Sequence, residues 1–384
     1  MSASGQPWTR LAFLAPAGIA LLLGMASGLG RLGLDVGFGP LADHGPLMVL
    51  GFLGTLISLE RAVAAAHRWG YVVPVLSGTG AIAVAVGAPL MLSSGVLIVA
   101  GLGLVTLTVR NLVIQPSLHL GVMTLGAAMW PLAAALWSRG AGPRDLVAPL
   151  AAFLVLTIVA ERLELSRLGL PSRRERVPLL AGIVVLVVAA TAAPVSFEAS
   201  WLLAGTALLV QAAWLGRYDL ARGTIHRRGL PRFVASCLLS GFGWLGVSGA
   251  LWIWHALAPA AFTYDAAVHA LFLGFVMAMV FGHAPIILPA VLRIDLPYQP
   301  IAYAPLVLLH LTLAARIGGD LLGSQWLRAT GGVGNVIAVV AFIVVNVGLA
   351  RPRPRAGAMA RPTPPASSRE PRDTAASPGA PRTR

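Results

Sequence analysis

Long apolar runs separated by short polar segments make up most of the chain. Each run is close to the roughly 20 residues that a helix needs to cross the hydrocarbon core of a bilayer. The third and fourth runs are separated only by Ser93, Ser94 and Gly95. The pattern predicts an all-α fold, a polytopic membrane helical bundle of about 12 transmembrane helices. The expected spans are residues 10–31, 45–66, 71–91, 94–114, 118–138, 145–166, 176–194, 198–216, 231–257, 266–291, 302–322 and 329–350.

The composition supports a chain whose main solvent is lipid. Hydrophobic residues make up 57% of it and charged residues only 11%, whereas a soluble domain carries about 25% charge. The net charge of +14 does not indicate a nucleic-acid partner, because the arginines lie in short loops and a tail between apolar spans. The single cysteine, Cys237, excludes an internal disulfide and a cysteine metal cluster. The expected partner is therefore membrane lipid.

The arginine distribution predicts the orientation of the chain. Arginines concentrate in the loops around 167–176 and 217–232 and in the tail from Arg351 onward, which fall on one side if there are 12 spans. The positive-inside rule then places both termini in the cytoplasm. Basic residues that are all arginine are typical of a GC-rich bacterial genome, so we expect a multi-pass protein of the bacterial inner membrane. Residues 1–351 form the predicted membrane domain, and the Pro-, Ala- and Arg-rich residues 352–384 a disordered cytoplasmic tail.

Histidines inside the spans are the main candidates for chemistry, since ionisable residues in a bilayer usually face the bundle interior and bind something. His44 and His269 lie at similar estimated depths near the outer ends of spans two and ten, while His283 and His310 form a deeper layer. Both outer histidines are followed by glycines that let a flat macrocycle approach the helix, and neutral imidazole binds iron or copper well. We therefore predict a haem between His44 and His269, with copper on His283 and His310 as a further candidate. The alternative is that each histidine only hydrogen-bonds to backbone or water.

Charged pairs provide a second group of candidates. Arg316 and Asp320 are spaced i, i+4, so Arg316 either pairs with Asp320 or holds a carboxylate such as a haem propionate. Leu59-Glu60-Arg61 and Ala160-Glu161-Arg162 end spans two and six with the same pattern. We interpret these two Glu-Arg pairs as interfacial ion pairs that fix helix ends.

Three segments resemble a known family. The stretch His269-Ala-Leu-Phe-Leu-Gly-Phe, then Arg293, then Ala315-Arg316-Ile-Gly-Gly-Asp320-Leu-Leu resembles the C-terminal half of the NnrS family, and the His-x6-Gly-Phe stretch at His44 resembles its second-span histidine segment. The resemblance implies a 12-span bacterial protein with haem and copper, associated with denitrification and nitric oxide stress. A more distant likeness to haem-copper oxidase subunit I implies that His44 and His269 ligate a low-spin haem. Because spans six and seven have no histidine, an oxygen-reducing binuclear centre is not expected.

The predicted function is a haem-binding, and as a further candidate copper-binding, integral membrane protein. It would act in nitrogen-oxide or respiratory metabolism or in the nitric oxide stress response, with other respiratory or denitrification membrane proteins as partners. Two alternatives stay open: a secondary transporter or ion-coupled permease, and an assembly partner with no chemistry of its own. Catalytic activity and oligomeric state are left open.

Overall fold

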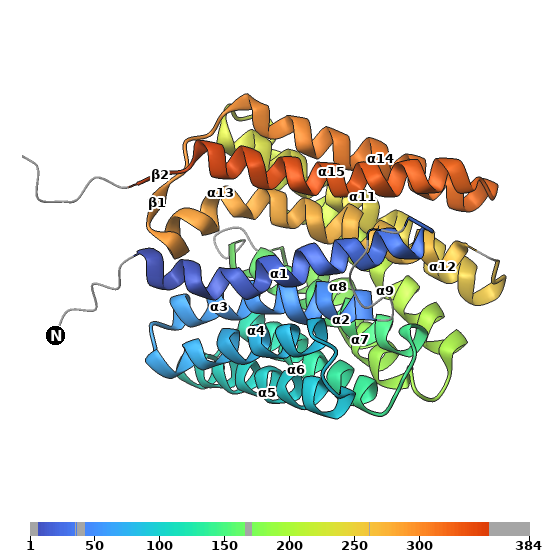
Figure 1. The fold of residues 1–384 in the computed structure, drawn as a ribbon, viewed down its shortest axis with the longest axis horizontal. Coiled ribbons are helices and arrows are strands. Elements are labelled where there is room, and N and C mark those ends of the chain that lie inside the picture. The colour runs from blue at the N-terminus through green and yellow to red at the C-terminus, as the bar shows by residue number, and fades with distance from the viewer. Residues whose placement is uncertain (1–6, 35, 37–42, 166–170, 261, 353–384) are drawn as a thin grey trace, which may run out of the picture.

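A computed structural model describes residues 7–34, 36, 43–165, 171–260 and 262–352 (Figure 1). The predicted tail from residue 353 onward lies outside this range. Within it, the helices are α1 (Pro7–Arg31), α2 (His44–Pro46), η2 (Leu47–Leu53), α3 (Gly54–Ala65), η3 (Arg68–Tyr71), α4 (Val72–Ala85), α5 (Leu90–Ile114), α6 (Leu118–Ser138), α7 (Pro143–Leu165), α8 (Arg173–Ala192), α9 (Phe197–Tyr218), α10 (Ala221–Thr224), α11 (Leu230–Leu257), α12 (Thr263–His269), η5 (Ala270–Met277), α13 (Ala278–Leu292), η6 (Pro300–Ala302), α14 (Tyr303–Leu322) and α15 (Gln325–Leu349). Two short strands complete the described chain: β1 (Ile294–Asp295) and β2 (Arg351–Pro352).

The long helices confirm the predicted all-α bundle. In the described residues, 11 helical stretches are long and apolar enough to cross a membrane. Two of them are composite: α2, η2 and α3 form one stretch over His44–Ala65, and α12, η5 and α13 form another over Thr263–Leu292. The segment predicted at 71–91 forms α4, which has only 14 residues and follows the 3₁₀ helix η3.

The break between the third and fourth predicted spans lies earlier than the sequence suggested. We expected Ser93, Ser94 and Gly95 to separate them, but these residues lie inside α5, where the Ser94 hydroxyl donates to the Leu90 carbonyl at 2.6 Å. The chain turns instead at Gly87, whose φ of +71° is a left-handed conformation that glycine adopts without strain. Pro89 follows as the N-cap of α5. A serine bonded to its own helix does not end it, so the serines misled the prediction.

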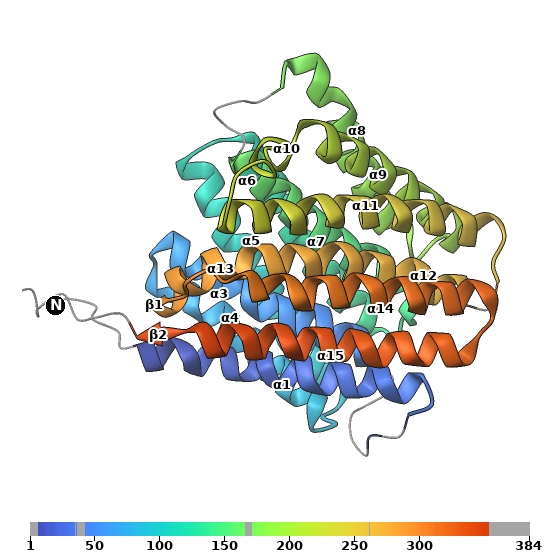
Figure 2. The same cartoon turned by 90° about the horizontal axis from the view of Figure 1, so that it is seen from above.

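Helix α7 lies at the centre of the bundle and other helices surround it (Figure 2). In this helix, 94% of the most apolar window is buried, against 33% in α8 and α15. A helix that is apolar on every side must be covered by other helices or by lipid. The peripheral helices instead expose large apolar residues such as Met91 and Val113. These exposed apolar faces are the surface that membrane lipid is expected to contact.

The start of α1, the first described helix, and the end of α15, the last, lie on the same side of the bundle. Both views place the start of α1 beside β2, which follows α15 (Figures 1 and 2). β2 pairs antiparallel with β1, which follows α13, so that Ile294 lies opposite Pro352 and Asp295 opposite Arg351. This pair of strands joins the ends of α13 and α15.

Candidate cofactor site

The structure brings His44 and His269 together. His44 is the first residue of α2 and His269 is the last residue of α12, more than 200 positions later in the sequence. Their ring centroids lie 6.3 Å apart and their planes differ by 29°. The two histidines that the sequence placed at one depth therefore lie side by side.

Both histidines are followed by a π-helix. η2 begins three residues after His44 and η5 begins directly after His269. A π-helix widens the turn to i→i+5 bonding, is rare, and is frequently found at functional sites. Sequence reasoning missed both of these segments, although the Gly-Phe pair that follows each histidine, at Gly51 and Gly274, was a shared signal.

The Nδ1 atom of each histidine is hydrogen-bonded to a backbone carbonyl. His44 Nδ1 lies 2.7 Å from the Gly24 oxygen, and His269 Nδ1 lies 2.9 Å from the Asp265 oxygen. A carbonyl only accepts hydrogen bonds, so Nδ1 carries the proton in both rings. In a neutral imidazole, Nε2 then keeps the lone pair that can bind a metal. Among the described residues, neither Nε2 has a hydrogen-bond partner.

Helix α1 approaches the His44 ring closely because Gly28 has no side chain. A Cβ built at Gly28 would lie 3.1 Å from Cε1 and 3.4 Å from Nδ1 of His44. A larger residue would press on the ring and shift it. Gly28 therefore lets the ring lie close to the α1 backbone.

A cavity of about 510 Å³ opens beside the two histidines. This volume lies within the range of roughly 300–1,000 Å³ that is typical of small-molecule and cofactor sites. Its walls come from α1, α2, η2, α7, α12, η5, α14 and α15, together with the turn between α4 and α5 and the turn between α6 and α7. Most of the lining is apolar, for example Met25, Leu53 and Phe272, while three arginines also line it: Arg31, Arg316 and Arg328.

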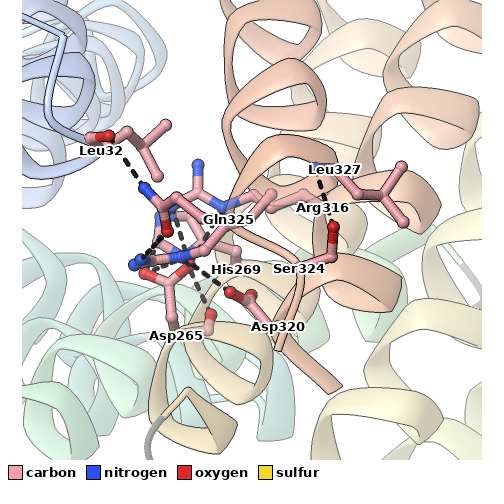
Figure 3. A network of polar contacts seen from close by, with 9 residues as sticks. Leu32, Asp265, His269, Arg316, Asp320, Ser324, Gln325 and Leu327 are labelled. Carbon is pink, nitrogen blue, oxygen red and sulfur yellow. Dashed lines mark hydrogen bonds and ion pairs between the residues drawn. The ribbon is translucent and has the colours of Figure 1, made fainter. Parts of the chain in front are cut away.

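A network of ion pairs lies beside His269 at the cavity (Figure 3). Arg316 donates to both carboxylate oxygens of Asp265, at 2.9 Å to Oδ2 and 3.3 Å to Oδ1. Asp320 pairs with Arg328 at 2.8 Å, and the Arg328 guanidinium also lies over the Phe262 ring. Arg316 therefore pairs with Asp265 from α12, and not with Asp320 of its own helix, which was the alternative predicted from the sequence. We call this group, with His44 and His269, the cavity end.

Close packing of α14 and α15 places the two arginines of the network together. A Cβ at Gly331 in α15 would overlap the backbone nitrogen of Arg316 in α14, and one at Gly319 in α14 would overlap that of Arg328 in α15. The two glycines let the helix backbones touch at this crossing. As a result, a cation from each helix reaches the same carboxylate, since Arg328 Nε also lies 3.8 Å from Asp265 Oδ2.

Of the two deeper histidines, His310 is held differently, whereas His283 is held by a backbone carbonyl as His269 is. Trp244 Nε1 donates to His310 Nδ1 at 3.0 Å, so the proton is on His310 Nε2, which donates to Ser240 Oγ at 2.9 Å. His283 Nδ1 donates to the Met279 carbonyl at 2.7 Å, and its buried Nε2 has no hydrogen-bond partner in the described chain. No group of three or more His, Cys, Asp or Glu residues in that part of the chain is arranged to hold a metal ion.

The two Glu-Arg pairs meet at a second polar cluster, which we call the far end. Arg61 bonds to the neighbouring Glu60 and also to Glu161 at 3.2 Å, so the two similar sequence segments contact each other. Arg162 instead forms a bidentate pair with Asp219, at 2.7 and 2.9 Å. This pair is buried, with 6% and 1% of the side chains exposed.

The chain belongs to a family described as a domain of unknown function, DUF8744, whose model matches residues 10–351. No curated protein matches the chain. No solved structure matches it either.

Proposed function

We propose that the chain is a haem-binding integral membrane protein in which His44 and His269 are the two axial ligands. The observation that supports this most is the distance between the rings. A metal–imidazole nitrogen distance of about 2 Å, plus about 1 Å from the nitrogen to the ring centroid, separates two trans imidazole centroids by roughly 6 Å. The observed 6.3 Å agrees with this expectation.

The surroundings of the two rings fit a haem. Histidines that ligate a metal almost always donate their other ring N–H to a carbonyl or carboxylate, which fixes the tautomer and the ring orientation. His44 and His269 both do so. Apolar walls suit a macrocycle, and the arginines beside the cavity suit its carboxylates, since a guanidinium binds a carboxylate in a bidentate manner. Arg316 is the arginine we propose for this role, through Nη1, because its Nε and Nη2 already donate to Asp265.

A bound haem would supply electron transfer or nitric oxide handling, and the protein would control its potential and access. We place the protein in nitrogen-oxide or respiratory metabolism because of the NnrS-like segments at His44, His269 and Arg316. Other respiratory or denitrification membrane proteins are the partners we propose. Copper is a separate proposal with less support, because His310 has both ring nitrogens in hydrogen bonds and only His283 has one unpartnered.

We further propose 12 spans, with both termini in the cytoplasm and the chain in the bacterial inner membrane. The twelfth span would be η3 with α4, which together run continuously over residues 68–85. An even number of spans agrees with α1 starting and α15 ending on one side of the bundle. The arginine-rich segments would then face the cytoplasm.

The test is a visible spectrum of the full chain, purified in detergent after expression with ample haem. The proposal expects a stoichiometric haem with the spectrum of a low-spin, six-coordinate iron. His310→Ala is a matched control, because it removes another histidine within a span and should leave the spectrum unchanged. A wild-type protein that stays haem-free would contradict the proposal.

A secondary transporter is the second candidate, and the cavity favours it as well. A volume of about 510 Å³ between helices from both halves of the chain could hold a solute instead of a cofactor. Haem-free protein that moves a solute across reconstituted vesicles would support this function. The same spectrum therefore separates the two candidates.

A further inference from the structure

The two histidines of the cavity end have unequal partners. His44 Nδ1 has one, the Gly24 carbonyl on α1. His269 Nδ1 donates to the Asp265 carbonyl at 2.9 Å and also lies 3.3 Å from the Asp265 carboxylate oxygen Oδ1. Only one of the two rings therefore has a negative charge behind it.

The Asp265 carboxylate is fixed in place. It lies four residues before His269 in the same short helix, α12, and Arg316 donates to both of its oxygens. Arg328 approaches the same carboxylate from α15. The two cations hold the carboxylate beside the ring and stop it from turning away. The orientation of His269 is thus set by its own helix and by two others.

The orientation of the His44 ring depends on fewer contacts. Its ring is held by one hydrogen bond to a different helix, and it rests against the bare backbone at Gly28. No acidic side chain hydrogen-bonds to this ring in the part of the chain that the structure describes. Turning the His44 ring away from the cavity therefore breaks one hydrogen bond and separates no charges.

A carboxylate behind a ligating histidine raises the basicity of the ligand, and loss of such a partner typically costs about 10–100-fold in metal affinity. We infer that His269, backed by Asp265, is the permanent ligand, and that His44 is the exchangeable ligand whose place a small diatomic molecule can take. In that exchange the bond to His44 Nε2 breaks and a bond to the incoming ligand forms, with no change of oxidation state. Asp265 acts as a positioning residue. The inference rests on the proposed haem.

The experiment compares His44→Gly with His269→Gly in the full chain, purified in detergent, by haem content and by carbon monoxide binding to the reduced protein. His44→Gly is expected to keep its haem, become five-coordinate and bind carbon monoxide at least tenfold more tightly than the wild type. His269→Gly is expected to lose haem, and added imidazole should restore it. Equal retention in both variants, or the reverse order, would overturn the inference while the proposed function stands. A haem-free wild type would instead overturn the proposed function.

A milder pair of variants covers the case in which a glycine variant fails to fold. Asp265→Asn removes the charge behind His269, whereas Glu198→Gln removes an exposed carboxylate that does not line the cavity. Asp265→Asn should raise the midpoint potential of the haem and lower haem retention at least tenfold, and Glu198→Gln should change neither. The same potential in both variants would show that Asp265 only stabilises the fold, which would overturn its assigned role.

Discussion

The cavity end and the far end are both polar clusters inside an apolar bundle, yet they satisfy their polar groups in different ways. At the far end, Arg162 and Asp219 use each other fully, in a buried bidentate pair. At the cavity end, each histidine uses one ring nitrogen and keeps the other without a described partner beside a cavity. A closed pair stabilises the fold, whereas an open pair of ligands can bind something. An unpartnered ring nitrogen beside a cavity separates the two roles, because the buried His283 also keeps Nε2 unpartnered but does not line the cavity.

The largest expected effect is the loss of haem when both proposed ligands are removed. The double variant His44→Ala/His269→Ala should lose all bound haem, because no metal ligand remains on either side. The double variant His283→Ala/His310→Ala is the control and should keep its haem. Haem per protein, measured from the spectrum of equal amounts of purified chain, checks this. Haem loss in the control alone would reverse the assignment.

The next largest effect is the loss of folding free energy when the Arg162–Asp219 pair at the far end is broken. Arg162→Met leaves the Asp219 carboxylate buried without its cation, which costs about 3–5 kcal/mol of folding free energy. Unfolding in detergent, followed by tryptophan fluorescence, measures this loss. Arg162→Met/Asp219→Leu should recover most of it, since both charges are gone. A fully stable single variant would show that the pair does not stabilise the fold.

A smaller effect is expected at the arginine of the cavity end. Arg316→Gln removes a cation beside the cavity and releases Asp265, so haem affinity should fall roughly tenfold while the helices stay folded. Competition with a haem-binding protein in solution measures the affinity. Arg222→Gln, at an exposed position, is the matched control. An unchanged affinity would exclude Arg316 from the site.

The smallest effect on the haem is expected from substituting the deeper histidines one at a time. His310→Ala breaks two hydrogen bonds to side chains, so it should destabilise the fold by about 1–3 kcal/mol without changing the haem spectrum. Metal analysis of the same preparation tests the copper proposal. Copper that disappears in both His283→Ala and His310→Ala would support it, and copper that persists in both would contradict it.

The sequence predicted most of the fold because each long apolar run specifies one helix. The span predicted at 231–257 is α11, Leu230–Leu257, within one residue. The break before α5 was misplaced because serines in a helix satisfy their hydroxyls within the helix, and hydropathy does not reveal this. The residues in the sequence that do mark this break are Gly87, where the chain turns after α4, and Pro89, which precedes α5.

The site could be predicted only in part. Equal depth and nearby glycines singled out His44 and His269, and the structure brings these two together. The partner of Arg316 was missed because spacing within a helix suggests Asp320, whereas Asp265 reaches it from α12. Contacts between helices that are distant in the sequence depend on helix rotation, which a pattern of apolar residues in a buried helix leaves undetermined. The π-helices were missed for a related reason, since they have no established signature in the order of residues.

The central claim is that His44 and His269 ligate one haem from opposite sides. Its most direct test is the low-temperature electron paramagnetic resonance spectrum of the oxidised, purified chain, with each single histidine variant beside it. The account predicts a low-spin ferric signal in the wild type that is replaced by a high-spin signal in His44→Gly and, if any haem remains, in His269→Gly. A wild type without haem, or a low-spin signal that survives both substitutions, would contradict it.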